Sequence, residues 1–453
     1  MQNCLIRQII FSVFIFFCSQ ILFADSFSVQ GSSIEQNGIN KVWRGANAMH
    51  VFGGSSNDMN AWNADLVREF IGDVKNTPIS GWATYVNGKW LHPLEKYIAN
   101  NRANGKVTIL TPFGWDGVSL TGKNPSQQIF YNEYKAKMRE WANYIKNQPD
   151  VWIEVWNEPY MWDNSNYPLD HSLWLSDMID LVDNIRATGC NNIILVPGNM
   201  QGQGEAPILA KADLLVKERI NIVFDLHAYE KWLDKVSYST IENRLQKLKE
   251  LNVAVMFGEL APMNAGVLMN PSDFLKAVQR KNISTAAWLW KYNSADRDAL
   301  FDSAGAVNNT NNNNWGSQYT THLLEPHTFN ASDGKNAGLV GDKDINTYWT
   351  SEGNQKAGQS ITIGFGLAKI WNHVRVDMGN QPYQYPYSFK VLSSDDGINW
   401  NEVTSRMGNP FITEFWVSTQ TSKWMRITLI ETPSNFASPW SIAEITVDNK
   451  NVF

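Results

Sequence analysis

Between residues 30 and 325, short apolar runs alternate with amphipathic stretches, and this rhythm limits the folds open to the chain. Repeated strand–helix units predict a parallel sheet with helices packed outside it. Amphipathic patterns over 130–147, 173–188 and 240–251, and a further one over 65–74, predict the helices. The predicted strands are seven apolar runs, 42–48, 107–112, 151–157, 192–197, 222–227, 253–258 and 284–290.

An eighth strand is expected over 73–82. About 290 residues with this rhythm favour a closed (β/α)8 TIM barrel over an open doubly wound sheet. The first strand is not followed by a glycine-rich phosphate loop, which points the same way. The Asn-rich run 308–314 resembles a linker, but residues 315–324 behind it can form the closing helix of the barrel. The barrel is therefore expected over 30–325.

Residues 328–450 have a different pattern. Segments 360–365, 373–376, 388–393 and 424–429 alternate apolar and polar residues and are separated by turn-forming Gly, Asn, Asp and Pro. This pattern predicts an all-β antiparallel sandwich, which contains no convergent pair of catalytic side chains.

The composition narrows the class of partner. Charge is nearly balanced, with 38 basic and 44 acidic residues and no basic block, which argues against nucleic acid and anionic membranes. The 20 Trp, 15 Tyr and 21 Phe exceed what core packing normally requires. A Trp ring has a flat apolar face suited to stacking on sugars, although most of these rings could equally belong to the core.

The first 24 residues predict a signal peptide. Arg7 precedes an apolar run over 9–17 that continues through 21–24, and a cleavage site is expected after Ala24. An uncleaved anchor helix is the alternative, for which the run is short. We expect a secreted protein, extracellular or periplasmic, that is a monomer with no membrane partner after the signal is removed.

Removal of this segment would leave one cysteine. Cys4 and Cys18 lie within it, so Cys190 would have no intrachain partner. A lone cysteine beside an apolar strand is usually a small buried hydrophobe, and no cysteine nucleophile is expected.

Two of the predicted strands end in a carboxylate. The run 151–157 leads into Glu158, and Pro159 lacks the N–H needed to continue the ladder. The run 253–258 leads into Glu259. A barrel keeps its chemistry at the carboxyl ends of its strands, so the two side chains can face each other across the mouth.

Two facing carboxylates are what glycoside hydrolysis requires. One donates a proton to the leaving oxygen, and the other, ionised, attacks the anomeric carbon. Each Glu alone could be a strand-end carboxylate in a salt bridge, but the pair in matching context favours the catalytic interpretation.

Other strand-end residues could support the pair. His227 and Tyr229 lie on one side by period-two alternation; the phenol could hold the nucleophile and the imidazole could tune the acid/base. Either could instead serve packing. Asn157 could bond a sugar 2-hydroxyl. Trp290, nearer the mouth than Trp288, is expected to be the sugar platform.

These residues occur in a family-specific order. The motifs are Trp156-Asn157-Glu158-Pro159, His227-Ala228-Tyr229, Gly258-Glu259 and a Trp on the last strand. The set resembles cellulase- and mannanase-like family 5 glycoside hydrolases, a retaining clan whose catalytic glutamates follow strands 4 and 7. The resemblance covers residues 30–324 and implies Glu158 as acid/base and Glu259 as nucleophile. The surrounding subsite would contain Asn157, His227, Tyr229 and Trp290.

Two positions depart from the family pattern. The family usually has an Arg at the end of strand 2 that supports the nucleophile, and the expected region, 73–78, has none. The family often has a His after strand 3, and residues 108–115 contain none. Trp115 and Asp116 are expected to form part of a changed subsite, which makes the substrate harder to assign than the mechanism.

The C-terminal region contains three further motifs, 341–349 (GDKDINTYW), 394–400 (SDDGINW) and 440–445 (WSIAEI). They resemble discoidin-type sandwiches used as family 32 carbohydrate-binding modules. The resemblance implies a structural Ca²⁺ held by Asp342, Thr347 and Glu444 with backbone carbonyls. These residues could alternatively be caps and turns without a metal.

The leading hypothesis is therefore a retaining hydrolase of β-1,4-linked polysaccharide, cellulose-like glucan or mannan, that needs no cofactor for catalysis. Alternatives are a β-glycosidase of the same fold acting on xylan or decorated glucan, and a non-catalytic carbohydrate-binding protein. Retention predicts carboxyl groups about 5–5.5 Å apart.

Overall fold

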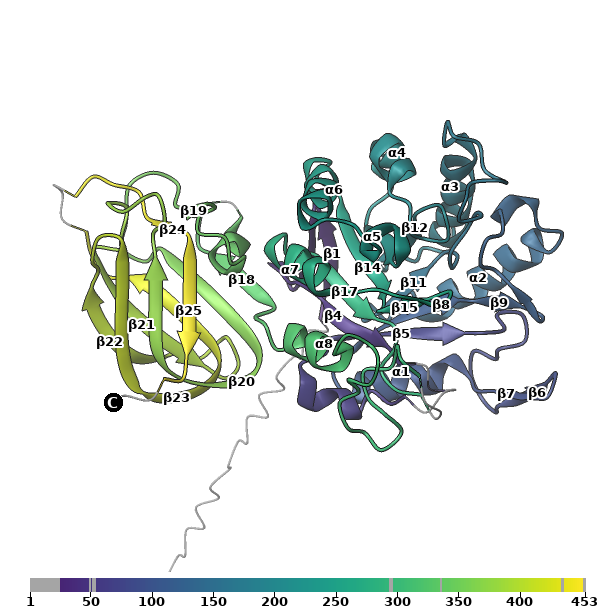
Figure 1. Ribbon diagram of the computed structural model, residues 1–453, viewed down its shortest axis with the longest axis horizontal. Helices are drawn as coiled ribbons and strands as arrows, with labels where there is room; N and C mark the ends of the chain where they lie inside the picture. The colour runs from purple at the N-terminus through teal and green to yellow at the C-terminus, as the bar shows by residue number, and fades with distance from the viewer. Residues whose placement is uncertain are drawn as a thin grey trace, which may run out of the picture.

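The computed structural model describes residues 25–48, 50, 54–292, 296–334, 336–432 and 436–450. The predicted signal peptide, with Cys4 and Cys18, lies outside these ranges. Figure 1 shows two units, an α/β barrel on the right and a sheet domain, coloured green to yellow, on the left. Among the described residues, no helix is long and apolar enough to cross a bilayer.

Eight parallel strands close into a barrel in the order β11-β12-β13-β14-β17-β4-β5-β8, which confirms the predicted fold class. The strands are β4 (Arg44–Asn47), β5 (Leu66–Ile71), β8 (Val107–Pro112), β11 (Val151–Glu154), β12 (Ile194–Pro197), β13 (Ile222–Ala228), β14 (Ala254–Leu260) and β17 (Ser284–Ala287).

The helices surround the barrel (Figure 1). They are α1 (Leu94–Ala103), α2 (Tyr131–Ile145), α3 (Ser172–Arg186), α4 (Ala206–Val216), α5 (Glu230–Leu233), α6 (Tyr238–Glu250), α7 (Ser272–Arg280) and α8 (Trp315–Leu323). In α2 the buried residues Tyr134, Met138, Trp141 and Ile145 recur every three or four positions, so one stripe faces the sheet.

The predicted position of the eighth strand is wrong. The strand is β5, within the stretch 65–74 that the pattern predicted as a helix, and it pairs in parallel with β4 and β8. Two charged residues inside the run imitate the polar face of a helix. Both are buried, because Arg68 points at carboxylates inside the barrel and Glu69 bonds His50 and Asn101 outside it.

The loops between the main elements contain small hairpins and 3₁₀ turns. They are β6 (Thr84–Val86) with β7 (Lys89–Leu91), β9 (Gly114–Trp115) with β10 (Val118–Ser119), β15 (Met263–Asn264) with β16 (Val267–Leu268), and the 3₁₀ turns η2 (Asp58–Trp62), η3 (Pro125–Gln127) and η4 (Ala337–Gly341). Residues 73–82, the expected eighth strand, instead lead from β5 into the first of these hairpins.

A three-stranded antiparallel sheet precedes the barrel and packs on its amino-terminal end. It consists of β1 (Phe27–Gln30), β2 (Ser33–Gln36) and β3 (Ile39–Asn40). The ring of Phe27 lies 5.7 Å from Trp43 and 6.2 Å from Trp152, and these two tryptophans meet edge to face. The interior is therefore filled at this end, and the opposite end remains for the site.

The second unit is built from antiparallel strands, in the order β18-β20-β23-β21-β22 with β25 paired to β20. They are β18 (Thr328–Ala331), β20 (Ser360–Asp377), β21 (Ser388–Ser394), β22 (Asn401–Met407), β23 (Ile412–Leu429) and β25 (Glu444–Asp448), with the short pair β19 (Trp349–Thr350) and β24 (Ser441–Ile442). The core contains three fully buried tryptophans, Trp349, Trp371 and Trp440.

The two units are joined by polar contacts as well as by the chain. Buried Arg44 of the barrel donates to the carbonyl oxygens of Glu325 and Pro326. Asn63 donates to the carbonyl oxygen of Phe365 at 2.9 Å, and Arg280 pairs with Asp344. The segment that links the domains is therefore held on both sides.

Most of the aromatic excess is core. Eleven of the 20 tryptophans are less than 2% exposed, and Cys190 is also buried. The most exposed tryptophans are few and stand out for that reason: Trp82, Trp90, Trp162 and Trp416.

Candidate active site

The two predicted catalytic glutamates meet at the carboxyl end of the barrel. Glu158 comes four residues after the end of β11, and Glu259 is the sixth residue of β14. One carboxylate oxygen of each lies within 4.8 Å of the other and of a ring nitrogen of His227. The side chain of Glu158 is 17% exposed and that of Glu259 only 4%, so the first faces solvent and the second lies beneath it.

The backbone presents Glu158 in an uncommon conformation. Its φ is +47°, in the left-handed region that non-glycine residues occupy at a cost of about 1–3 kcal/mol. Strand β11 ends at Glu154, so the ladder no longer restrains this turn, and the following Pro159 cannot extend it. The local strain places the carboxylate at the mouth.

A bulge orients Glu259. The pairing of β13 with β14 shifts register after Leu226, so that His227 lies opposite Glu259. Gly258 sits in this bulge and donates its N–H to the Asp225 carboxylate at 2.6 Å. A Cβ at position 258 would lie 2.3 Å from a carboxylate oxygen of Asp225, which explains the glycine in the Gly258-Glu259 motif.

Glu158 has two side-chain partners. Its Oε1 lies 3.0 Å from Nδ1 of His227, and its Oε2 accepts from the hydroxyl of Thr121 at 2.9 Å. Thr121, which the sequence did not single out, comes from the loop between β10 and α2. Both carboxylate oxygens are thereby fixed while the group remains open to solvent.

Glu259 has stronger partners. Arg68 donates to its Oε1 at 2.5 Å and the Tyr229 hydroxyl donates to its Oε2 at 2.8 Å. Burial raises the pKa of Glu259, and the charges of His227 and Arg68 together with the Tyr229 hydrogen bond act against this shift. These donors favour the ionised form that a nucleophile needs.

Arg68 is the arginine that was expected at the end of strand 2 and missed. It is fully buried and lies at the centre of the site, where three groups accept from it besides Glu259: Glu154, Asn47 and Asn157, each at 2.9 Å. Burial opposes its charge, but the carboxylates around it raise the pKa of the guanidinium further above its ordinary value. The site therefore contains a permanent cation.

Tyr229 and His227 both lie where the sequence predicted. Burial and the Glu259 charge raise the pKa of Tyr229 well above its ordinary value, so the phenol remains a hydrogen-bond donor. Burial alone would lower the pKa of His227, but the Glu259 charge and the contacts with Asp225 and Glu158 raise it to about 10. The charged imidazolium thus lies between the carboxylates of Glu158 and Glu259.

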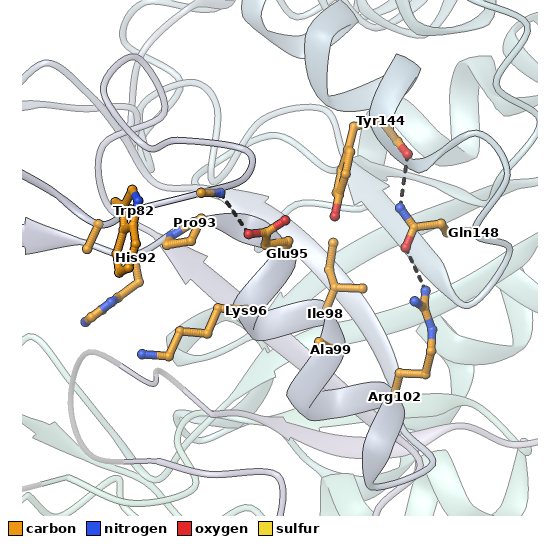
Figure 2. Close-up of a pocket in the computed structure, with 12 residues that line it drawn as sticks. Trp82, His92, Pro93, Glu95, Lys96, Ile98, Ala99, Arg102, Tyr144 and Gln148 are labelled. Atoms are coloured by element: carbon orange, nitrogen blue, oxygen red, sulfur yellow. Dashed lines mark hydrogen bonds between the residues drawn. The ribbon is translucent and has the colours of Figure 1, made fainter.

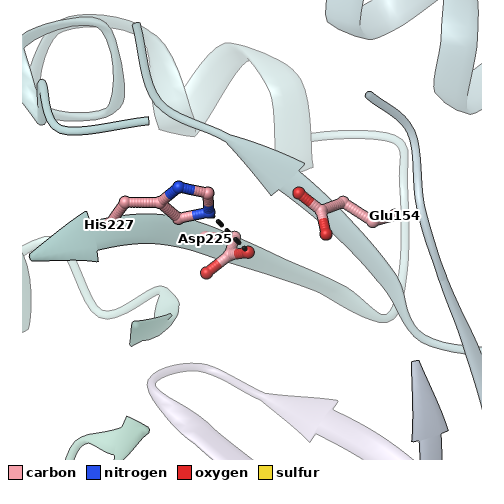
Figure 3. Close-up of side chains that lie close together, drawn as sticks. All are labelled: Glu154, Asp225 and His227. Atoms are coloured by element: carbon pink, nitrogen blue, oxygen red, sulfur yellow. Dashed lines mark ion pairs between the residues drawn. The ribbon is translucent and has the colours of Figure 1, made fainter. Parts of the chain in front are cut away.

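Two further buried carboxylates, Glu154 and Asp225, lie near Glu158 and Glu259. Figure 3 shows Glu154, Asp225 and His227 close together, with an ion pair of 3.8 Å between the imidazole Nε2 and Asp225. Burial raises the pKa of Glu154 to about 7, although the charge of Arg68 opposes this shift. Among the described residues, Glu154 Oε1 and Asp225 Oδ2 have no hydrogen-bond partner.

These acidic clusters contain the residue types of a metal site, but their charges are already balanced. The His227-containing groups with Glu154 and Asp225, and with Glu158 and Glu259, are close enough to share an ion. The Arg68 guanidinium occupies the space between them and pairs with both Glu154 and Glu259. A fixed cation there disfavours a second one.

Asn157 is buried and bonded within the cluster. Its Oδ1 accepts from Arg68, and its Nδ2 lies 3.4 Å from the Thr121 hydroxyl that serves Glu158. Asn157 is therefore linked to Glu259 through Arg68 and to Glu158 through Thr121.

The predicted sugar platform, Trp290, and the predicted subsite residue Trp115 are both buried. Trp290 is 1% exposed and packs on Phe301 with ring centroids 4.5 Å apart, and Trp115 is 4% exposed and stacks on Phe130. Neither has a face open to a ligand. The prediction for Trp290 assumed that side chains alternate between the two faces up to residue 290. Strand β17 ends at Ala287, so this alternation does not reach Trp290. Asp116 pairs with Lys75 on the surface.

The aromatic wall of the site is formed by other residues. Phe70, Phe113 and Trp288 are partly buried and contact one another, with ring centroids 4.1–6.4 Å apart. The Arg68 guanidinium lies 5.2 Å from the Phe113 ring. Phe113 follows β8, the third barrel strand, where the family often has a His, so this end of the subsite is apolar here.

The three predicted calcium ligands come together in the sandwich. The Thr347 hydroxyl donates to Asp342 at 2.7 Å, and Asp342 shares a hydrogen bond with Glu444. Burial raises the pKa of Asp342 to about 6, and burial with the Asp342 charge raises that of Glu444 to about 8. Among the described residues, the buried Oε1 of Glu444 has no hydrogen-bond partner.

A (β/α)8 barrel with carboxylate oxygens of two glutamates within 4.8 Å of each other at its mouth has the arrangement that glycoside hydrolysis requires. Residues 28–294, more than half of the chain, match the family model described as cellulase (glycosyl hydrolase family 5). Residues 317–445 match the F5/8 type C domain. The chain belongs to glycosyl hydrolase family 5, and an F5/8 type C domain follows its catalytic barrel.

Several solved structures share the barrel. The catalytic domain of a mannanase from Streptomyces sp. SirexAA-E is 17% identical with a TM-score of 0.51, covering 71% of this chain and 94% of that domain. A β-mannanase from Thermomonospora fusca is 17% identical with a TM-score of 0.52, covering 66% of this chain and 97% of its own. At this identity the likeness shows the fold. No curated protein matches the chain.

Proposed function

We propose that the chain is a retaining hydrolase of β-1,4-linked polysaccharide that works by double displacement. The observation that carries the proposal is the spacing of the two carboxylates, which have oxygens within 4.8 Å of each other. Inverting enzymes separate their carboxyl groups by about 6.5–9.5 Å to hold a water molecule, whereas retaining enzymes place them about 5–5.5 Å apart. The pair in this barrel fits retention.

In the first step, Glu158 donates its proton to the glycosidic oxygen and the Glu259 carboxylate attacks the anomeric carbon. The bond to the leaving oxygen breaks, and a covalent glycosyl ester forms on Glu259. Arg68 and Tyr229 each hold one oxygen of the attacking group, so its orientation is set before the substrate arrives.

In the second step, Glu158 has become a carboxylate and removes a proton from water as that water attacks the anomeric carbon. The ester bond to Glu259 breaks and the sugar leaves with its original anomeric configuration. His227, whose Nδ1 lies 3.0 Å from Glu158, stabilises the carboxylate that exists between the two steps.

For the substrate we propose cellulose-like glucan or mannan. The wall of Phe70, Phe113 and Trp288 offers apolar faces to sugar rings, and the solved structures that share the barrel include several named β-mannanases. Xylan or a decorated glucan is the alternative. Reducing-sugar release from a panel of glucan, mannan and xylan separates these substrates, and release from none of them would contradict the proposal.

A non-catalytic carbohydrate-binding role is less well supported. The sequence favoured this role only in that the arginine and the histidine usual in the family were not found near the two glutamates. Arg68 supplies the arginine, because it contacts Glu259 directly. Binding of a polymer without hydrolysis would favour this role.

The sandwich is proposed to hold a structural Ca²⁺ and to bind sugar. Asp342, Thr347 and Glu444 offer hard oxygen ligands, and the orphaned buried oxygen of Glu444 fits such an ion. Bound calcium would fix these loops and take no part in hydrolysis. The exposed ring of Tyr383 and the contacting pair Tyr385 and Phe436 are candidates for the sugar contacts.

Export is proposed on the pattern of the first 24 residues, and the secreted enzyme is expected to be a monomer. Intact mass of the protein recovered from the culture medium should place the mature N-terminus at Asp25. A mass that retains residues 1–24 would contradict cleavage.

A further inference from the structure

A groove of about 670 Å³ lies outside the barrel, between the β6–β7 hairpin and the helices α1 and α2. Figure 2 shows Trp82 and His92 at one end of it, Tyr144 and Gln148 at the other, and Glu95 on α1 between them. We call this the flank groove, and it includes neither catalytic glutamate nor any residue that contacts them.

The hairpin beside the groove exposes large aromatic rings. Trp82 is 93% exposed, and Tyr85 and Trp90 are 59% and 61% exposed. Tyr85 and Trp90 lie opposite each other in the hairpin, with ring centroids 5.1 Å apart, and this pair stabilises the turn. Trp82 has no ring contact with another described aromatic residue, so intramolecular packing does not account for its position.

The exposure contrasts with the rest of the molecule. Most other tryptophans are buried, whereas the two three-residue strands of this hairpin have no fully buried residue. A group of large apolar side chains that remain exposed often marks a binding site. The hairpin is therefore a candidate surface for a ligand with flat apolar faces.

The groove is held rigid. The N–H groups of Leu94 and Glu95 bond the carbonyl oxygens of Pro78 and Ile79, which closes the base of the hairpin loop. The Glu95 carboxylate accepts from the N–H of Gly81 at 2.8 Å (Figure 2). At the far end, Gln148 joins Arg102 to the carbonyl oxygen of Tyr144. Little ordering entropy would be lost on binding.

The lining chemistry favours a neutral, hydroxyl-rich ligand. The lining combines the rings of Trp82 and Tyr144 with polar side chains that can donate or accept hydrogen bonds. These polar side chains are His92, Glu95 and Lys96. The Arg102 charge is already paired with Asp150 at 2.6 Å. A nucleic acid or anionic membrane would require an excess of unpaired basic groups, while sugars have hydroxyls that both donate and accept.

The position of the groove links it to the catalytic mouth. The hairpin follows the carboxyl end of β5, so it stands at the rim, and Figure 1 shows β6 and β7 at the lower right of the barrel. From there α1, ten residues and about 15 Å long, runs down the barrel wall. A polymer held along it would lie outside the catalytic subsites.

We propose that the flank groove and the rings of Trp82, Tyr85 and Trp90 form a second binding site for a neutral polysaccharide, which holds the enzyme on its polymer. The inference rests on the proposed function in that the same polysaccharide is cleaved at the mouth. Binding at this site does not require Glu158 or Glu259.

The test compares the full chain with W82A, W90A and the triple variant W82A/Y85A/W90A. Migration in native gels containing soluble glucan, mannan or xylan measures binding, and hydrolysis of the polymer is compared with hydrolysis of a short oligosaccharide of the same sugar. The matched control is I220A, an exposed apolar residue before β13 at the opposite end of the barrel.

Each single variant should weaken polymer binding about fivefold, and the triple variant tenfold or more. KM for the polymer should rise by a similar factor, while kcat/KM for the short oligosaccharide stays within twofold. I220A should match the wild type in all of these measurements. The unchanged turnover of the short substrate also shows that the triple variant is folded.

The two proposals fail in different ways. If a polymer retards the wild type in the gel but the wild type hydrolyses no polymer, the proposed function is refuted. The flank-groove inference would still hold if the triple variant is no longer retarded. Equal retardation of wild type and triple variant, or no retardation on any polymer, would overturn the groove inference. So would a wild-type dimer that the triple variant converts to monomer, because the rings would then be a contact between two copies of the chain.

Discussion

The molecule buries carboxyl groups in two places and balances their charge differently. In the barrel, Glu154 and Glu259 both pair with Arg68, which is fully enclosed. In the sandwich, Asp342 and Glu444 contact each other, and no ion pair joins either of them to a cation among the described residues. The pKa of each sandwich carboxyl is raised, to about 6 and about 8.

The difference shows what each site is built to do. A guanidinium is charged at every physiological pH, so the barrel site needs no ion from solution to hold the Glu259 carboxylate in place. A carboxyl pair without such a partner either takes up a proton or binds a cation. The barrel is therefore expected to work without metal, and the sandwich is expected to respond to it.

The largest effect should come from removing the nucleophile. Glu259→Ala should lower kcat by on the order of 10⁴-fold or more, because no ester can form. External azide should restore part of the turnover of an activated substrate and yield a glycosyl azide of inverted configuration. The control is Glu69→Ala, which removes a carboxylate on the outside of β5. Loss of activity without azide rescue would count against the assignment.

Removing the buried cation should damage both activity and stability. Arg68→Met leaves Glu154 and Glu259 buried without their partner, so we expect a loss of about 3–5 kcal/mol in the free energy of unfolding. Denaturant unfolding measures this loss, and kcat should fall about 10²–10³-fold. Arg68→Lys should recover part of the stability, because it restores a charge without the forked geometry. A fully stable Arg68→Met would disprove the account of the barrel charges.

Calcium should separate the two regions. At a concentration of Ca²⁺ 100 times its Kd, linkage stabilises the domain that binds it by about 2.7 kcal/mol. We expect calorimetry to show a higher Tm for the sandwich transition with Ca²⁺ than with chelator, and an unchanged barrel transition. Glu444→Gln should abolish this difference. A calcium-dependent rise in Tm that is confined to the barrel transition would contradict this assignment of the calcium site to the sandwich.

Without calcium, the Tm of the sandwich should fall as the pH rises, and this change should be smaller than the effect of calcium. The pKa values of Asp342 and Glu444 are raised from ordinary values of 3.8 and 4.5 to about 6 and about 8. A raised carboxyl pKa contributes stability that is present below the ordinary value and lost as the pH rises through the folded value. The Tm in chelator should therefore fall between pH 5 and pH 8.5, and Glu444→Gln should flatten this decline. A Tm that rises over this range would contradict the shifts.

The proximity of Glu158 and Glu259 could be predicted from the sequence because it depends on where two strands end. Glu158 and Glu259 each follow an apolar run, and parallel strands in a barrel end at the same mouth. His227 and Tyr229 lie within the same register, so their contacts with the pair follow from the same argument.

The place of Arg68 in the site was not predicted, because a charged residue inside a short apolar run resembles the polar face of a helix. A length argument could have found it. The run spans only six residues, from Leu66 to Ile71, and Gly72 and Asp73 end it, which suits a strand better than a helix. The buried partners that make the charge tolerable come from distant strands, and local sequence does not reveal them.

The burial of the two selected tryptophans was not predicted, for a different reason. Trp115 and Trp290 were chosen for their positions near strand ends, but side-chain direction follows a fixed period only while the strand continues. Beyond β17 and β8 the loop conformation sets the direction of each side chain, and there Trp288 and Phe113 contact each other. Exposure of a ring is a property of the tertiary packing.

The measurement that tests the central claim most directly is the configuration of the first product. ¹H NMR of the wild-type enzyme acting on a β-1,4-linked oligosaccharide resolves the α and β anomers before they equilibrate. Carboxylates within 4.8 Å predict that the β anomer appears first and the α anomer follows by mutarotation. An initial α anomer would show inversion and contradict the assignment of Glu259 as a nucleophile.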